Sequence, residues 1–206
     1  MLTLLHPAVA EAPEPPFASL DPSWAADWAA SLASPSMRAM ISRDPRLRER
    51  LPSMLAVAHQ AGRLEAAAVS VADLGAYRAF VADPARFRHL LGLAWHARAL
   101  SRVIDGDLLR AHGGQIDATD LPIVMSFADI ETECEALPQP GRLLQAAETV
   151  ALRLIQAWAA GLPAAYRARV AFCVPKNINL NFDQLEFENH YLALIVHRVA
   201  EALRRP

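Results

Sequence analysis

Lysine, cysteine and long apolar runs are all scarce in this sequence. Lys176 is the only lysine, and the other 19 of the 20 basic residues are arginine, a bias that we attribute mostly to GC-rich coding. Cys134 and Cys173 are too few for a disulfide framework, and each lies in a helical or apolar setting, so a reducing compartment fits. No stretch approaches the roughly 18 uninterrupted apolar residues of a membrane span. We therefore expect no membrane insertion except through a partner.

Several other absences narrow the class of protein. The first ten residues, MLTLLHPAVA, lack a positive leading region, and His6 and Pro7 interrupt their apolar stretch, so we expect no signal peptide. The net charge of −2 gives no basic excess for wrapping nucleic acid or lying on an anionic membrane. Aromatic and β-branched residues are few, and the 53% hydrophobic share comes largely from alanine and leucine, which are good helix formers. The sequence therefore predicts an all-α protein.

We expect one helical domain, residues 21–206, after a proline-rich N-terminal arm, residues 1–20. The arm contains four prolines, a composition that resists helix. A repeated device then marks helix starts, because an N-cap residue followed by proline suits the first helical turn. It occurs at Asp21-Pro22, Ser34-Pro35, Asp44-Pro45 and Asp83-Pro84.

The stretch from Asp83 to Gln115 carries the strongest helical signal, and we expect the other helices to pack around it. Its apolar residues recur at three- and four-residue steps, which places them on one side of a helix. They are Phe87, Leu90, Leu91, Ala94, Ala97, Leu100 and Ile104. Leu93, Trp95 and Val103 widen this apolar stripe, so that little of the helix surface is left to contact water. The helix is predicted to end at Asp105-Gly106, because glycine closes a helix without strain.

Further helices are predicted on both sides of this central element. Ser70 and Asp73 resemble a capping box that opens a helix through Phe80. Additional helical segments are expected over residues 64–69, 107–112, 119–137, 141–161, 163–173 and 183–205. Residues 174–182 change period, because Ile178, Leu180 and Phe182 alternate with asparagines in the manner of a half-buried strand. We expect an isolated extended segment there, the alternative being a hairpin formed with residues 169–174.

No pattern indicates a catalytic centre, a cofactor or a metal. His89 and His96, like His190 and His197, are seven residues apart, beyond the one-turn spacing at which two side chains of one helix share a metal. Gly113-Gly114 lacks the flanking strand and further glycines of a phosphate loop. Cys173 has no nearby base in the sequence, so its alternative interpretation as a nucleophile lacks an activating group.

Two clusters of charge are candidates for contact with partners. The basic one comprises Arg46, Arg48 and Arg50, with Arg43 beside them, and it is open to interpretation as ordinary surface, as a nucleic-acid contact or as contact with an acidic partner. The acidic one comprises Glu131, Glu133 and Glu135, with Asp129 before them. Two-residue steps scatter these carboxylates around the predicted helix, so they indicate a solvated face that could attract an arginine-bearing partner rather than acid/base catalysis. Trp24 and Trp28 are either core anchors or interface residues.

The central segment LGLAWHARALSRVIDGDLLRAHGGQI, followed after a gap by GLPAAYRARVAFCVP, resembles the K component of bacterial type III secretion systems, the SctK family that includes YscK and PscK. The length and the Ala/Leu/Arg-rich helical character agree over nearly the whole chain, with the N-terminal arm contributing little. The family has no catalytic fingerprint, and no family motif assigns interface residues to this chain.

The resemblance implies a non-enzymatic, cytoplasmic adaptor of the sorting platform, peripheral to the inner membrane through the secretion apparatus. Such an adaptor links the cytoplasmic domain of the ring protein SctD to the SctQ pods, which carry the SctL spokes and the ATPase. Two other classes stay open. A helical small-ligand-binding or regulatory module would need an internal apolar pocket, and a small helical enzyme would need polar groups that converge in one.

Overall fold

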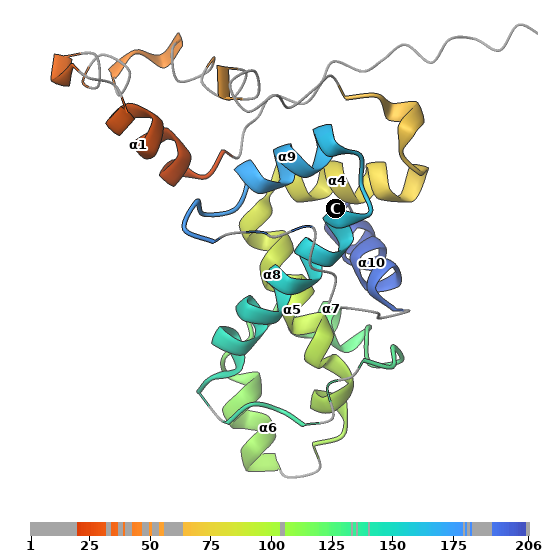
Figure 1. Cartoon of the computed structure of the whole chain (residues 1–206). Coiled ribbons are helices and arrows are strands. Elements are labelled where there is room, and N and C mark those ends of the chain that lie inside the picture. Colours follow the sequence, from red (N-terminus) through yellow and green to blue (C-terminus); the bar gives the residue numbers. More distant parts are fainter. Residues whose placement is uncertain are drawn as a thin grey trace, which may run out of the picture.

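The computed structural model of the chain describes residues 20–31, 34–36, 39, 43–46, 50, 54–55, 64–103, 106–132, 134, 136–139, 141–178, 180, 182 and 191–204. Every regular element within these ranges is helical and none is a strand, which confirms the predicted all-α class. Figure 1 shows these helices gathered around α5. The predicted arm, apart from residue 20, lies outside the described residues.

The described helices occupy the following ranges of the chain. In order they are α1 (Pro22–Ser31), the 3-10 turn η1 (Ala66–Ala68), α4 (Val71–Ala82), α5 (Pro84–Ser101), α6 (Gly106–Gly113), α7 (Leu121–Met125), α8 (Leu143–Ala160), α9 (Ala164–Phe172) and α10 (Leu192–Arg204). In Figure 1, α6 lies at the end of the molecule opposite α1 and α9.

Aspartate caps set the starts of these helices as the sequence predicts. Asp21 accepts a hydrogen bond from the amide of Ser23 and Asp83 one from the amide of Arg86, both at 2.9 Å. Ser70 does the same for Asp73 at 3.0 Å, and the Ser70 hydroxyl donates back to the Asp73 carboxylate. These bonds satisfy first-turn amides that have no partner within a helix. The predicted starts of α1, α4 and α5 are therefore confirmed.

Helix α5 is the centre of the fold. It packs most extensively against α8 and also contacts α4, α7 and α10. The apolar residues predicted for its buried side are inside the protein as far as Leu100, and Leu93 and Trp95 are buried too. Aromatic rings extend this core, with Phe80 of α4 edge-on to Phe87 at 5.5 Å between centroids. The helix is thus surrounded by protein on most sides.

Helix α5 ends earlier than the sequence predicts. Its last residue is Ser101, and the amides of Arg102 and Val103 bond three residues back, to Ala99 and Leu100, in the tighter pattern of a terminating helix. The predicted stop at Asp105-Gly106 was wrong, because Gly106 instead begins α6. The predicted break of the following helix is confirmed, since α6 ends at Gly113.

The predicted helix over residues 119–137 was also wrong, since among the described residues of this range only α7, Leu121–Met125, is α-helical. Beyond Met125 the amides bond to carbonyls three residues back, and these turns still bury Phe127 and Ile130. Arg198 of α10 donates to the Ser126 carbonyl at 2.7 Å and pairs with Asp129, which ties this stretch to α10.

The remaining predictions for the C-terminal half hold in part. Helices α8 and α9 are confirmed close to their predicted ranges of 141–161 and 163–173. Because α9 is helical through Phe172, the hairpin alternative for residues 169–182 was wrong. Residues 175–178 form turns, while residues 179, 181 and 183–190 lie outside the described residues. The described part of the last helix, α10, begins at Leu192.

Helix α1 is attached to the bundle at the end of α9. The Asp21 amide donates to the Phe172 carbonyl, and the Trp24 indole nitrogen donates to the Val174 carbonyl, both at 2.9 Å. The indole also stands edge-on to the Phe172 ring, with 5.1 Å between centroids. Trp24 is therefore a half-buried anchor of α1.

Candidate functional site

The structure places the predicted charge clusters only in part. Arg46 and Arg50 are exposed, and Glu131 is exposed and pairs with Arg98 of α5 at 2.7 Å. Arg48, Glu133 and Glu135 lie outside the described residues. The described residues of this acidic stretch, 129–132 and 134, are not helical, so the predicted helix around which its carboxylates would be scattered was wrong there. Asp129, at its start, pairs with Arg198 at 2.9 Å.

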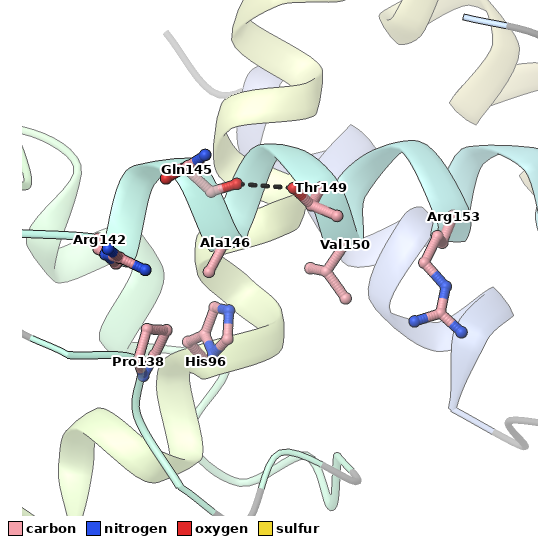
Figure 2. A pocket seen from close by; sticks show the side chains of 8 residues that line it. All are labelled: His96, Pro138, Arg142, Gln145, Ala146, Thr149, Val150 and Arg153. Atoms are coloured by element: carbon pink, nitrogen blue, oxygen red, sulfur yellow. Dashed lines mark hydrogen bonds between the residues drawn. The ribbon is translucent and has the colours of Figure 1, made fainter.

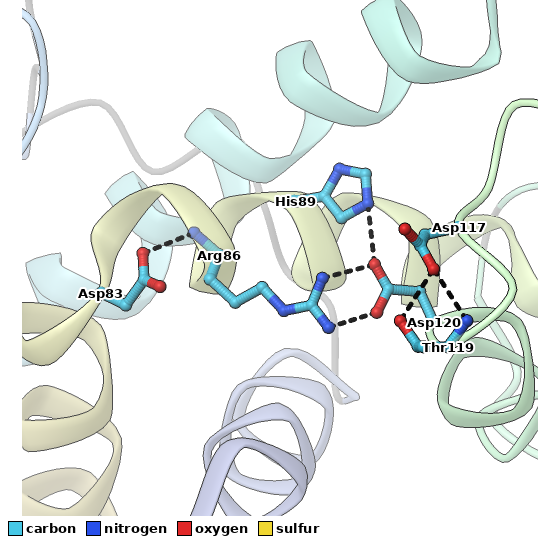
Figure 3. Close-up of polar contacts among 6 residues, drawn as sticks. All are labelled: Asp83, Arg86, His89, Asp117, Thr119 and Asp120. Carbon is cyan, nitrogen blue, oxygen red and sulfur yellow. Dashed lines mark hydrogen bonds and ion pairs between the residues drawn. The ribbon is translucent and has the colours of Figure 1, made fainter.

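A buried carboxylate joins the start of α5 to the start of α7 (Figure 3). Asp120 is fully buried, and both of its oxygens accept hydrogen bonds from the guanidinium of Arg86. His89 Nε2 lies 3.3 Å from one of them. The hydrogen bond to Asp120 raises the pKa of Arg86 above its usual value. Because the carboxylate is engaged from α5 on two sides, this cluster fixes the α6–α7 segment on the central helix.

A second carboxylate connects three helices. Asp73 of α4 accepts hydrogen bonds from the Trp158 indole of α8 at 3.1 Å and contacts His197 Nε2 of α10 at 2.8 Å. Burial raises the pKa of Asp73, and the bonds from Ser70, His197 and Trp158 more than offset this, so the pKa is lowered. The ionised carboxylate is thus favoured by the fold.

A groove runs along one face of α8 (Figure 2). It encloses about 460 Å³, and its principal lining residues are His96, Pro138, Arg142, Ala146, Val150 and Arg153. At 3.6 residues per turn, the α8 members of this set fall within one side of the helix, and Arg142 and Arg153, eleven residues apart, point almost the same way. Both arginines are exposed, while Ala146 and Val150 are half-buried.

His96 of α5 lies at the base of this groove. Its Nδ1 is 3.0 Å from the Cys134 sulfur, and its buried Nε2 has no hydrogen-bond partner among the described residues. Burial lowers the pKa of His96 from 6.5 to about 4, so the ring is neutral at physiological pH. The Cys134 thiol also donates to the Ala136 carbonyl at 3.4 Å. One ring nitrogen of His96 therefore keeps an unused capacity for a hydrogen bond.

The two thiols and the histidines have separate environments. Cys173 is buried, and burial raises the pKa of its thiol to about 12, so it is protonated at neutral pH and a poor nucleophile. Among the described residues, no three His, Cys, Asp or Glu side chains gather as metal ligands would. His89 pairs with Asp120 and His96 with Cys134, two helical turns apart along α5.

Neither the groove on α8 nor the contacts of the Asp73 and Asp120 carboxylates with distant helices were predicted from the sequence. Arg142 and Arg153 are three helical turns apart, a spacing that could have indicated a shared face once α8 was predicted. The pairing of Asp120 with Arg86 spans 34 residues, and no local pattern indicates it.

No protein-family model, curated protein or solved structure matches this chain. Among the described residues, no helix combines the length and apolar character needed to cross a bilayer. The residues and their arrangement, together with the resemblance to the SctK family, are therefore the basis for a functional proposal.

Proposed function

We propose that this chain is a non-enzymatic adaptor of a type III secretion sorting platform, linking the cytoplasmic domain of an SctD-type ring protein to SctQ-type pods. The observation that carries the proposal is the resemblance to the SctK family over LGLAWHARALSRVIDGDLLRAHGGQI and GLPAAYRARVAFCVP. In this role the protein acts in the cytoplasm, reaches the inner membrane through its partners, and approaches the SctL spokes through the pods.

The placement of the two resembling stretches supports this proposal. The first stretch covers most of α5 and all of α6, and the second covers α9. Helix α5 supplies much of the core, and α9 packs on α4 and α8. The resemblance thus covers much of the central helix α5, together with α6 at one end of the molecule and α9 at the other. Interface residues, by contrast, must be sought on the surface of this chain.

The chemistry of the described side chains also favours a binding role. The buried carboxylate of Asp120 and the half-buried carboxylate of Asp73 are both held by side chains of neighbouring helices. Cys173 is kept protonated by burial, and His96 is kept neutral. The α8 groove instead combines an apolar floor with exposed arginines, which suits recognition of another molecule.

Co-purification tests the proposed function. The chain would be mixed with the cytoplasmic domain of the SctD-type protein, with the SctQ-type protein, and with both, each taken from the same bacterium. We expect two binary complexes and one ternary complex by size-exclusion chromatography with light scattering. Failure to bind either protein would refute the proposal. A deletion strain should in addition lose effector secretion and recover it with the intact gene.

A small-ligand-binding or regulatory module is the second candidate. The observation that favours it is the groove of about 460 Å³ at whose base lies His96, with its unpartnered Nε2. Native mass spectrometry of the protein purified from its own bacterium tests this role. A stoichiometric small molecule that is lost from a His96→Phe variant would support it, whereas the bare mass of the chain would contradict it.

A further inference from the structure

We propose that the cleft between α4 and α10 docks an acidic segment of a partner protein, with a carboxylate of that segment paired to Arg78 and Arg204. This inference rests on the adaptor role and names a surface that performs part of it. The cleft encloses about 510 Å³ where α10 ends beside α4 (Figure 1). Both arginines line it, one from each helix, and both are exposed.

The two guanidinium groups are not engaged within the protein. Among the residues that the structure describes, Arg78 and Arg204 have no hydrogen-bond or ion-pair partner. Arg98 of α5, by contrast, is already paired with Glu131. Two cationic groups of the cleft are thus available to an anion from outside, and a guanidinium matches the geometry of a carboxylate with two parallel hydrogen bonds.

Gly75 gives the Arg204 guanidinium a defined position in the cleft. A Cβ at Gly75 would meet the Nη1, Nη2 and Cζ atoms of Arg204, so the guanidinium lies against the bare backbone of α4. Arg78 follows Gly75 by three residues and lies on the same face of that helix. Both positive groups therefore gather on one face of α4, and the position of Arg204 before binding reduces the entropy that is lost when a partner docks.

An apolar surface adjoins these arginines. Val71, Leu74 and Leu203 line the same cleft, and Val71 is 91% exposed at the start of α4. Val71, Leu74 and Arg78 follow one another at three- and four-residue steps, so they share one face of the helix. A partner side chain that covered Val71 and Leu74 would remove apolar surface from water. The cleft therefore fits a segment that combines an apolar side chain with a carboxylate.

The spacing along α4 predicts the order of side chains in that segment. Leu74 and Arg78 are four residues apart, which is roughly 6 Å along the helix axis. Two residues of an extended chain cover about the same distance and return to the same face. Asp83 lines the far end of the cleft, where it would repel a second carboxylate. In the direction from Leu74 to Arg78, the expected segment carries an apolar residue, a spacer and an acidic residue.

The charge of the cleft favours a protein over nucleic acid. Two arginines beside one aspartate, on a chain of net charge −2, fall short of the basic track that follows a phosphate backbone. A free inorganic anion would leave the side chain of Val71 in water. The cleft beside Asp120 does not compete for an acidic partner, because it is lined by three aspartates and its arginine, Arg86, is bonded to Asp120.

Charge reversal tests the inference. We would compare the wild-type chain with Arg78→Glu/Arg204→Glu and with the control Arg102→Glu/Arg142→Glu, which changes the net charge equally at exposed positions outside the cleft. Affinity for the SctD-type cytoplasmic domain and for the SctQ-type protein would be measured by calorimetry at low and high salt. We expect the cleft variant to lose at least about tenfold in affinity for one partner, with a weaker salt dependence, and the control to stay within about twofold.

Gly75→Ala tests the placement of Arg204 without removing a charge. The added methyl group would displace the guanidinium from the backbone of α4. We expect affinity for the same partner to fall about two- to fivefold, while the free energy of unfolding in urea stays the same or rises. Unchanged affinity in this variant would overturn the role given to Arg204.

The outcomes separate the inference from the function on which it rests. If the cleft variant binds both partners as tightly as the wild type, the docking surface is elsewhere and the adaptor role stands. If the wild-type chain binds neither partner, both proposals fall. Self-association of the wild type that the cleft variant loses, measured by light scattering, would assign the cleft to a second copy and overturn the inference.

Circular dichroism would establish that the variants fold. Should charge reversal prevent folding, Arg78→Gln/Arg204→Gln carries the same test with a smaller expected loss, and unchanged binding by that variant would refute the inference.

Discussion

Gly92 of α5 faces the backbone of Ala147 on α8 so closely that a Cβ added at Gly92 would lie 2.1 Å from the Ala147 carbonyl oxygen. The two longest described helices, α5 and α8, therefore cross with their backbones nearly in contact. Backbone atoms cannot rotate away as a side chain can. The absence of a side chain at Gly92 thus sets the distance between α5 and α8.

Substitution of Gly92 by alanine should destabilise the protein. Alanine is favoured over glycine in a helix by about 1 kcal/mol, but here its methyl group would force α5 and α8 apart, at a cost at or above the upper end of the roughly 1–3 kcal/mol that is typical of overpacking. We expect a net loss of about 1–3 kcal/mol in the free energy of unfolding by urea denaturation.

Gly75 of α4 provides the matched control for this prediction. A Cβ there would meet the guanidinium of Arg204, at 2.4 Å from Nη2, and the end of a long exposed side chain can move. Gly75→Ala should therefore be neutral or stabilising. Equal stability of the two alanine variants would show that α5 and α8 tolerate more separation than the structure indicates.

The ion pair of Arg86 with Asp120 should respond unequally to loss of its two members. Arg86→Ala leaves the fully buried Asp120 carboxylate with His89 as its remaining partner, and we expect a loss of about 2–4 kcal/mol. Asp120→Ala instead leaves a guanidinium whose side chain is 35% exposed and can turn to water. The double variant should be more stable than Arg86→Ala alone, and simple additivity in urea denaturation would contradict this account.

His96 should make the protein less stable in mild acid. Its pKa is about 6.5 when unfolded and about 4 in the folded protein. Above pH 6.5 both states are neutral and the stability is fully present. As the pH falls from 6.5 to 4, the unfolded state binds a proton that the folded state does not, so stability decreases by up to about 3 kcal/mol.

Unfolding free energies measured across this pH range test the prediction. In His96→Gln the free energy of unfolding should fall less steeply as the pH decreases, because up to one proton fewer is taken up on unfolding. The lowered pKa of Asp73 is not expected to mask the effect, because its contribution is lost only as the pH falls below the usual aspartate pKa of about 4. An unchanged slope in the variant would assign the acid sensitivity to other groups.

The two cysteines should differ in reactivity toward a thiol reagent such as Ellman's reagent. Cys173 is 3% exposed with a pKa of about 12, so it should react only after unfolding. Cys134 is partly exposed, and burial raises the pKa of its thiol, so it should react slowly in the native protein. We expect one accessible thiol in the native state, two in denaturant, and none in native Cys134→Ser. Rapid reaction of Cys173 in the native protein would contradict its burial.

The parts of the fold that depend on neighbouring residues could be predicted from the sequence. Asp21 and Asp83 each precede a proline, and a cap bond forms within two or three residues, so the helix starts were readable. The buried side of α5 could likewise be predicted, because it follows from the spacing of apolar residues within the helix itself. Residues 119–137 were mispredicted as one helix, and the contacts that hold this stretch, such as the bond from Arg198 to the Ser126 carbonyl 72 residues away, leave no local pattern in the sequence. The apolar spacing still predicted correctly that Phe127 and Ile130 are buried, although the backbone there is not helical.

The candidate site was less accessible to sequence analysis because it forms between elements. Arg142 and Arg153 line a groove only because Pro138 and His96, from other segments, lie beside α8. The predicted clusters around Arg46 and Glu131 were chosen on charge alone, and Glu131 proves to be paired with Arg98. A charged residue in a sequence does not reveal whether it already forms an ion pair with another residue of the same chain.

Lys176 sits where α1 is attached. Its amide donates to the Ser23 hydroxyl at 2.8 Å, and its ammonium group pairs with Asp27 and lies 5.5 Å from the centre of the Trp24 ring. Since the sequence offers no second lysine, an amine-reactive ester has this single side chain to modify besides the α-amino group, and peptide mapping distinguishes the two products. The reactivity of Lys176 toward a fluorophore or an isotope-coded reagent would thus report detachment of α1 from the rest of the protein without any mutagenesis.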